Sequence, residues 1–143
     1  LNRFSFKVKE QIKSPKKIYA VDNGLIKAES VSLSSNAGRL LENLVFVELL
    51  RRGEKANLDL FSYLTRNRRE VDFIIKQGSE VYQLLQVCYG LDAENKKREI
   101  KALIEASSEL RCDNLFIITF DQEENLKIAN KTIQIVPLNQ WLI

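Results

Sequence analysis

Two apolar stretches that each carry a polar side chain constrain the fold of this chain more than any other feature. Residues 69–75 and 84–89 are rich in β-branched and aromatic residues, and a short turn around Gly78 separates them. This pattern predicts a β-hairpin. Asp72 and Gln86 lie within the stretches, and a carboxylate or an amide in an apolar sheet must find partners or serve a site. The sequence therefore predicts a polar site built on this hairpin.

The length of the turn decides the face on which each polar residue lies, because side chains in a strand alternate between two faces. A three-residue loop over residues 78–80 pairs Gln77 with Val81 and places Asp72 opposite Gln86. These two side chains then share a face with Ile74, Leu84 and Cys88. A two-residue loop instead puts Asp72 and Gln86 on opposite faces and removes the site.

The other elements follow from hydrophobic periodicity and from turn and capping residues. Strands are predicted over residues 4–8, 16–24 (ending in an Asp22-Asn23-Gly24 turn), 58–64, 70–76, 114–120, 126–128 and 133–136. Helices are predicted over residues 37–52, between N-cap candidates Ser34, Ser35 and Asn36 and the terminator Gly53, and over residues 93–110 after the N-cap Asp92. After Pro137, Trp141 is expected to plug the core. This order predicts one α/β domain over residues 1–143, with a mixed β-sheet and a helix on each side.

Glu42 is an anomaly within the first predicted helix. Val45, Phe46 and Leu49 lie three, four and seven positions after it, which places its carboxylate on an apolar stripe. A carboxylate in such a place needs a cation, a metal ion or a hydrogen-bond donor. A contact with local backbone or with Arg39 is the alternative, since acidic residues favour the first turns of helices.

Basic residues gather in the turn that precedes the strand of Asp72. Arg66, Arg68 and Arg69 lie beside the predicted acidic site and can contact nucleic-acid phosphates, although a solvated hairpin loop also explains them. Lys96 and Lys97 are further candidates for such contacts, but the charged run of residues 96–99 is also typical of a solvated helix face. The net charge of +3, from 22 basic and 19 acidic side chains, permits a nucleic-acid partner without requiring one.

The composition excludes some classes of protein. Cys88 and Cys112, without any histidine, cannot build a tetrahedral zinc site, and we expect both to be reduced thiols of a cytoplasmic protein. No run approaches the roughly 20 apolar residues of a membrane span, and the first residues lack the pattern of a signal peptide. Because the chain begins with Leu1 and contains no Met, we expect it to be a piece of a longer protein.

Three of these features together resemble the PD-(D/E)XK nuclease superfamily. They are the helix of residues 38–43 with its Glu, the strand of residues 70–72 with its Glu-Val-Asp, and the following strand of residues 86–88 with its Gln-Val-Cys. More narrowly, residues 17–25 followed by residues 38–43 are similar to the C-terminal domain of unknown function of prokaryotic, especially archaeal, AAA-type P-loop ATPases. This resemblance covers nearly the whole chain. It implies a restriction-endonuclease-like core and an upstream domain of the same chain that binds ATP.

The superfamily resemblance also implies a chemistry. In active members, carboxylates from the helix, the hairpin and the next strand hold one or two Mg²⁺ ions, and a Lys two residues further on positions the attacking water. Glu42 and Asp72 match metal ligands, Gln86 stands at the place of the third carboxylate, and Cys88 stands at the place of the lysine. An amide weakens metal binding, and a neutral thiol cannot replace an ammonium. Candidates for a displaced ammonium are Lys76, Lys96 and Lys101.

These departures favour a nuclease-like accessory domain of an AAA-type ATPase that has lost catalysis and binds DNA or a partner. One alternative is an active Mg²⁺-dependent DNA endonuclease with a rearranged site. The other is a structural domain that regulates the assembly of the ATPase.

Overall fold

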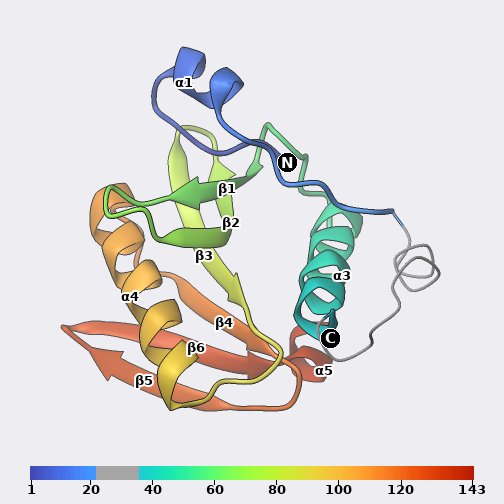
Figure 1. Cartoon of the computed structure of the whole chain (residues 1–143), viewed down its shortest axis with the longest axis vertical. Helices are drawn as coiled ribbons and strands as arrows, with labels where there is room; N and C mark the ends of the chain where they lie inside the picture. The colour runs from blue at the N-terminus through green and yellow to red at the C-terminus, as the bar shows by residue number, and fades with distance from the viewer. Residues whose placement is uncertain (22–35) are drawn as a thin grey trace.

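The computed structural model describes residues 1–21 and 36–143, which form a six-stranded sheet with helices packed against it (Figure 1). The strands are β1 (Leu60–Leu64), β2 (Glu70–Gln77), β3 (Glu80–Val87), β4 (Leu115–Thr119), β5 (Glu124–Ile128) and β6 (Lys131–Pro137). The helices within the described ranges are α1 (Val8–Lys13), α3 (Ala37–Arg51), α4 (Ala93–Leu110) and α5 (Leu138–Trp141). The predicted α/β class is confirmed.

The sheet is mixed, in the order β1-β2-β3-β4-β6-β5. Strands β1, β2 and β3 form an antiparallel meander, whereas β3, β4 and β6 run parallel and β5 pairs antiparallel with β6. A parallel neighbour requires a crossover connection, and α4 supplies it between β3 and β4. Strand β4 lies inside the sheet, with Leu115, Ile117 and Ile118 at most 1% exposed, as its apolar sequence favours.

Helices α3 and α4 cover opposite faces of the sheet, as predicted. Leu103 of α4 belongs to the same core cluster as Ile74 and Leu84. Val45 of α3 belongs to a second cluster with Phe73 and Leu85, whose side chains alternate with the former pair along β2 and β3. Because neighbouring strand residues point to opposite faces, the two clusters are the two sides of one sheet.

The turn between β2 and β3 combines features of both predicted alternatives. It has only two residues, since Gln77 pairs with Glu80, and Gly78 adopts a φ of +64° that suits glycine. The register then shifts between Ile75 and Lys76, so that Phe73 pairs with Leu85. Such a bulge adds one residue to β3 and restores the register that a three-residue loop would give. Consequently, the two-residue turn does not separate Asp72 from Gln86.

The helix boundaries were predicted closely. Helix α4 begins after Asp92, whose side chain accepts hydrogen bonds from the backbone N–H groups of Glu94 and Asn95, while the Asn95 side chain returns a bond to the Asp92 backbone. Helix α3 ends one residue earlier than predicted, and Gly53 follows it with a φ of +101°. Asn36 occupies the N-cap position of α3 without a capping side-chain hydrogen bond, and the other two N-cap candidates lie outside the described residues.

The two predictions of strands near the start of the chain were wrong. Only Arg3 forms an isolated bridge there, and Val8 begins a helix. The alternating pattern misled because Phe4 is buried while Phe6 and Val8 are 74% and 69% exposed, so the alternation does not mark the two faces of a sheet strand. Residues 16–21 are extended along the core but form no strand, and the predicted turn at residues 22–24 lies outside the described residues.

The last elements agree with the sequence-based prediction. The two predicted last strands are present as β5 and β6, which pair as an antiparallel hairpin, and Trp141 packs partly buried against the core cluster on the α3 side. The guanidinium of Arg52, the C-cap residue of α3, lies 4.1 Å from the centre of the Trp141 ring. Cys88 and Cys112 are both free thiols. Within the described residues, no helix is long and apolar enough to cross a membrane.

Candidate functional site

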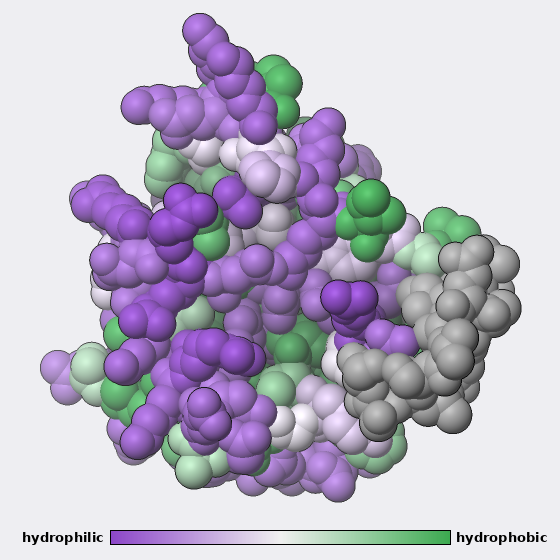
Figure 2. Space-filling view, in the orientation of Figure 1, coloured by the Kyte–Doolittle hydropathy of each residue, from purple (hydrophilic) through white to green (hydrophobic). Residues whose placement is uncertain are grey.

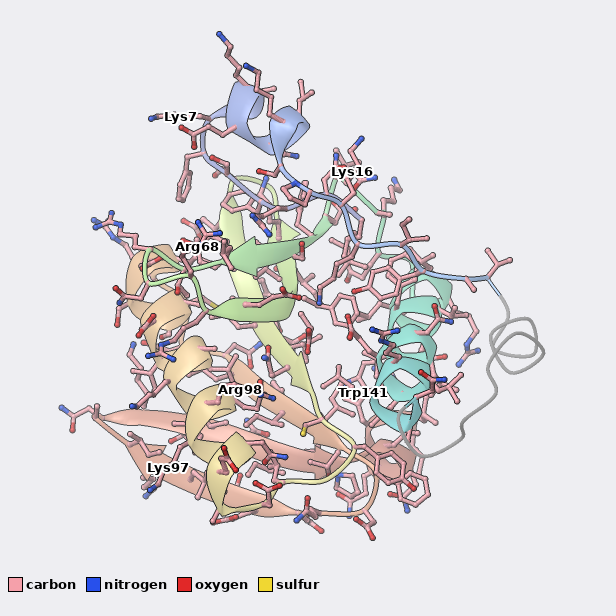
Figure 3. The ribbon with its side chains drawn as sticks, viewed as in Figure 1. Lys7, Lys16, Arg68, Lys97, Arg98 and Trp141 are labelled. Carbon is pink, nitrogen blue, oxygen red and sulfur yellow. The ribbon has the colours of Figure 1, made fainter. Side chains whose placement is uncertain are left out.

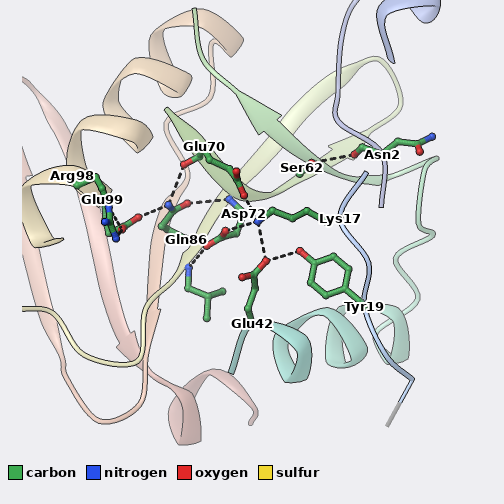
Figure 4. Close-up of polar contacts among 11 residues, drawn as sticks. Asn2, Lys17, Tyr19, Glu42, Ser62, Glu70, Asp72, Gln86, Arg98 and Glu99 are labelled. Carbon is green, nitrogen blue, oxygen red and sulfur yellow. Dashed lines mark hydrogen bonds and ion pairs between the residues drawn. The ribbon is translucent and has the colours of Figure 1, made fainter. Parts of the chain in front are cut away.

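A cluster of charged side chains lies where residues 16–21, here called the strap, pass the start of β2 and the second turn of α3 (Figure 4). The Lys17 Nζ atom of the strap lies 2.9 Å from Oε1 of Glu42, 2.5 Å from Oε1 of Glu70 and 2.7 Å from Oδ1 of Asp72. We call Glu42, Glu70 and Asp72 the carboxylate cluster. The ammonium donates hydrogen bonds to Glu42 and Asp72 and forms an ion pair with Glu70.

The strap also supplies Tyr19, whose hydroxyl donates a 2.6 Å hydrogen bond to Oε1 of Glu42. The ring of Tyr19 stacks on Phe46 of α3 at 4.2 Å between centroids. Burial, and then the nearby Glu42 carboxylate, raise the pKa of the Tyr19 hydroxyl, which therefore stays protonated and donates. The cation and the donor that Glu42 requires on its apolar stripe thus come from the strap.

Asp72 is held by both strands of the hairpin. Its backbone N–H donates to Oε1 of Gln86 at 3.0 Å, and its Oδ2 accepts from the backbone N–H of Val87 at 2.9 Å. The sequence-based expectation that Asp72 and Gln86 lie together is confirmed. Burial raises the pKa of Asp72 to about 6, and the Glu42 carboxylate adds to this effect while the Lys17 ammonium opposes it.

Gln86 connects the hairpin to α4. Its Nε2 donates to the backbone oxygen of Glu70 at 3.1 Å and to Oε2 of Glu99. Glu99 is 6% exposed and pairs with Arg98 at 2.7 Å, so the charged run of residues 96–99 is not wholly solvated as predicted. The sequence does contain a signal for the burial of Glu99. Ala102 and Leu103, three and four residues further along α4, are buried and share its side of the helix.

Cys88 presents a free thiol and no ammonium. Its Sγ donates to the backbone oxygen of Gly90 at 3.1 Å, and burial raises the pKa of the thiol. The displaced lysine candidates lie elsewhere: the Lys76 ammonium is 5.5 Å from the centre of the Phe4 ring, Lys96 pairs with Glu124, and Lys101 is exposed. The ammonium at the cluster is that of Lys17, which the sequence reasoning missed. Lys17 and Tyr19 alternate with Ile18 in an extended segment, and this spacing could have placed both on one side.

The arrangement does not fit a divalent cation at the carboxylate cluster. The oxygens surround Lys17 Nζ at 2.5–2.9 Å, which are distances of charge-assisted hydrogen bonds, whereas Mg²⁺ binds oxygen at about 2.0–2.1 Å. The Oε1 atom of Gln86, the predicted third ligand, already accepts the Asp72 N–H. Among residues 1–21 and 36–143, no group of three or more acidic or cysteine side chains is arranged to hold a metal ion.

An open cleft of about 630 Å³ lies next to the cluster. Its lining includes Arg39 from α3, Arg68 and Arg69 from the β1–β2 turn, and Arg98 from α4. Figure 2 shows a mostly hydrophilic surface over α4 and this turn, and Figure 3 shows Arg68 beside the turn and Arg98 on α4. The cleft is therefore lined by cationic side chains from three elements together with the carboxylate cluster and Glu99.

The predicted nucleic-acid contacts fall into two groups. Arg69 and Lys96 are engaged in ion pairs with Glu105 and Glu124, at 2.8 Å and 2.5 Å. The side chains of Arg66, Arg68 and Lys97 form no ion pair with a described carboxylate, and the same holds for Arg39, which the sequence reasoning did not propose as a phosphate contact. Of these unpaired cations, Arg39 and Arg68 line the cleft.

Comparison with known proteins places the chain among relatives of undescribed activity. Residues 37–141 match the model of DUF4143, a domain of unknown function. The chain is 46% identical over 147 aligned positions to an uncharacterized protein of Methanocaldococcus jannaschii, covering 99% of this chain and 32% of that protein. It is 32% identical over 79 positions to an uncharacterized protein of Haemophilus influenzae, covering 55% of this chain and 18% of that protein. The chain thus spans about a third of the length of its archaeal relative, and its match to the bacterial relative covers a smaller share of that protein.

Among solved structures, the chain is similar to one chain in the assembly of Thermococcus gammatolerans McrB AAA+ hexamers with bound McrC. The TM-score is 0.45 and the sequence identity is 10%, over 71% of this chain and 28% of that one.

Proposed function

This chain belongs to the DUF4143 family, and from its site we propose that it is a nuclease-like accessory domain that does not cleave DNA but binds it. We propose further that it serves an AAA-type ATPase encoded in the same chain. The single observation that carries the proposal is the position of the Lys17 ammonium, which takes the carboxylates of Glu42, Glu70 and Asp72 at once.

The argument against catalysis rests on what the polar groups already do. Metal-dependent hydrolysis needs ionised carboxylates with room for a metal ion and its water. Here all three carboxylates are bonded to one ammonium, and the amide oxygen of Gln86 is bonded to backbone. Cys88 is a neutral thiol, so it cannot stabilise developing negative charge as an ammonium would.

The argument for DNA rests on the arginines of the cleft. A guanidinium binds phosphate oxygens with two parallel hydrogen bonds, and such contacts supply most of the sequence-independent affinity for nucleic acids. Arg39 and Arg68 are without ion pairs to described carboxylates, and Arg98 is 69% exposed in its side chain although it pairs with Glu99. Their placement on three elements suits a phosphate backbone that passes across the cleft.

The association with an ATPase rests on the sequence resemblance of residues 17–25 and 38–43 to domains that follow such enzymes. The share of the archaeal relative outside the match leaves room for a nucleotide-binding domain. A Gly-x-x-x-x-Gly-Lys-Ser/Thr sequence between a strand and a helix in that part would support the association, and its absence would contradict it.

The test of catalysis and binding uses the chain with plasmid, single-stranded and branched DNA. We expect no cleavage with Mg²⁺ or Mn²⁺ and salt-dependent retention of DNA. Replacing Arg39 and Arg68 together with Ala should lower the slope of log affinity against log salt by about 2, since each neutralised phosphate contributes about 1. The matched control replaces Lys55 and Lys127, two exposed lysines outside the cleft, and should leave the slope nearly unchanged.

Two outcomes would contradict the proposal. Cleavage that disappears in Asp72→Ala would show an active endonuclease. Absence of DNA retention at low salt would leave an assembly role for the domain instead.

A further inference from the structure

The strap is fastened to α3 by polar and aromatic contacts, of which Figure 4 shows the bond from Tyr19 to Glu42. The backbone N–H of Ala20 donates to Oδ1 of Asn43 at 2.8 Å, and Nδ2 of Asn43 donates to the Ala20 oxygen at 2.9 Å. Tyr19 adds its stacked ring and its bond to Glu42. In contrast, Ile18 is 94% exposed, so the strap turns one side inward and the other to solvent.

Lys17 is the inward residue with the largest electrostatic effect. Burial opposes its charge, but the carboxylates of Asp72 and Glu42 more than offset that effect and hold the pKa of the ammonium above its usual range. Its side chain is only 23% exposed. A buried or half-buried group of carboxylates without a counter-ion is strongly unfavourable, so the fold requires a cation at this point.

Glu42, Glu70 and Asp72 come from two elements that are separate in the sequence, yet one atom of the strap contacts all three. A divalent metal ion would gather carboxylates in the same way, but with shorter distances and with room for water. Lys17 donates hydrogen bonds to Glu42 and Asp72, holds Glu70 in an ion pair, and repels any second cation at the same place.

We propose that Lys17 is a built-in replacement for a metal ion. Its ammonium neutralises the carboxylate cluster, ties the strap to β2 and α3, and excludes divalent cations from the site. The domain therefore folds without a metal ion. Divalent cations can bind the carboxylate cluster only when the strap or the charge of Lys17 is removed. This inference does not depend on DNA binding, because it concerns only the cation that the carboxylates hold.

The test compares Lys17→Met, which keeps most of the side-chain volume but removes the charge, with Lys17→Arg, which keeps the charge. Thermal unfolding is followed in EDTA and in increasing MnCl₂, and Mn²⁺ binding is measured by electron paramagnetic resonance. We expect the unmodified chain and Lys17→Arg to show no bound Mn²⁺ and an unchanged Tm. Lys17→Met should have a lower Tm in EDTA, bind one Mn²⁺, and gain about 5 °C or more at saturation.

Two controls separate this role from that of an ordinary ion pair. Lys16→Met alters the exposed neighbouring residue of the strap and should behave like the unmodified chain. The double variant Lys17→Met with Asp72→Asn should lose the Mn²⁺-dependent gain, because one carboxylate is then missing.

The proposal is overturned if the unmodified chain binds Mn²⁺ at the cluster as tightly as Lys17→Met does. It is also overturned if folded Lys17→Met binds none. Should Lys17→Met fail to fold in EDTA, recovery of its cooperative unfolding transition by Mn²⁺ supports the proposal, and no recovery contradicts it.

Discussion

Asp72 is the residue at which burial and ion pairing oppose each other most directly. Burial raises its pKa to about 6, although the Lys17 ammonium is 2.7 Å away and Val87 donates a backbone hydrogen bond to it. Three carboxylates face a single ammonium, so the cluster carries more negative than positive charge. The most deeply buried of the three therefore retains a proton to higher pH than an exposed aspartate would.

This difference predicts a pH dependence of folding. Between its ordinary value of 3.8 and about 6, Asp72 holds a proton in the folded chain that the unfolded chain has released. Its contribution to stability is then fully present below about pH 4 and is lost as the pH rises through about 6, by up to about 3 kcal/mol. Urea unfolding of the chain and of Asp72→Asn at pH 4, 5, 6 and 7 checks this.

As the pH rises from 4 to 7, the unmodified chain should lose stability relative to Asp72→Asn, because the asparagine does not titrate. Asp121→Asn, in an exposed loop, should give a nearly constant difference over the same range. A constant difference for Asp72→Asn as well would mean that the ion pair with Lys17 fully offsets the effect of burial on the pKa of Asp72.

At the scale of secondary-structure elements, the β2–β3 hairpin determines that Asp72 and Gln86 lie on the same face of the sheet. Its two-residue turn alone would have turned Asp72 and Gln86 to opposite faces, but the bulge in β3 restores their alignment. Gln86 then joins three elements, since its amide bonds to the backbone of β2 and to Glu99 of α4. The amide, which donates and accepts, suits this position better than a carboxylate would.

Replacing Gln86 with Glu tests this role as a connector of elements. The change introduces a carboxylate, which removes the two Nε2 hydrogen bonds and brings a negative charge against buried Glu99. We expect a loss of about 3 kcal/mol in the free energy of unfolding at pH 8 and a smaller loss at pH 4.5, where the new carboxyl is partly protonated. Chemical denaturation at both pH values measures it.

Gln134→Glu provides the matched control, because Gln134 is exposed on β6. It should cost less than about 0.5 kcal/mol at either pH. An equally small effect of Gln86→Glu would show that the amide is not required to hold α4 to the hairpin.

At the scale of the whole molecule, segments from distant parts of the chain pack against α3 and the residue that follows it. The strap packs along α3, and α5 packs against its other end, where the Arg52 guanidinium lies over the Trp141 ring and donates to the Trp141 backbone oxygen. Glu48 accepts from both Arg51 and Arg52, and these bonds hold the pKa of Glu48 at about 2. Helix α3 thus organises two segments that lie far from it in sequence.

Trp141→Ala should lower the free energy of unfolding by about 2 kcal/mol, because a partly buried aromatic ring and its contact with Arg52 are lost. Leu142→Ala, at a neighbouring residue that is 37% exposed, should cost less than about 1 kcal/mol. Denaturant titration of both variants measures the difference. Equal losses would argue that α5 is not anchored through the tryptophan.

Much of the architecture could be predicted from the sequence because it follows from local patterns. The periodicity and caps of α4, the apolar run of β4 and the hairpin of β2 and β3 were sufficient to predict a mixed sheet between two helices. The same patterns identified Glu42, Asp72 and Gln86 as polar groups in apolar surroundings. A carboxylate or amide on an apolar stripe is visible in the sequence, since its neighbours at helical or strand spacing are known.

The partners of those groups were decided only by the tertiary structure. Lys17 lies 55 residues from Asp72 and 25 from Glu42 in the chain, so no local pattern pairs its ammonium with either carboxylate. The sequence offered Lys76, Lys96 and Lys101 as sources of an ammonium, yet the cation at the cluster is Lys17 of the strap. Ion pairs form between atoms that the fold brings within about 4 Å, whatever their separation in sequence, and for that reason the sequence located the carboxylates while only the structure identified their counter-ion.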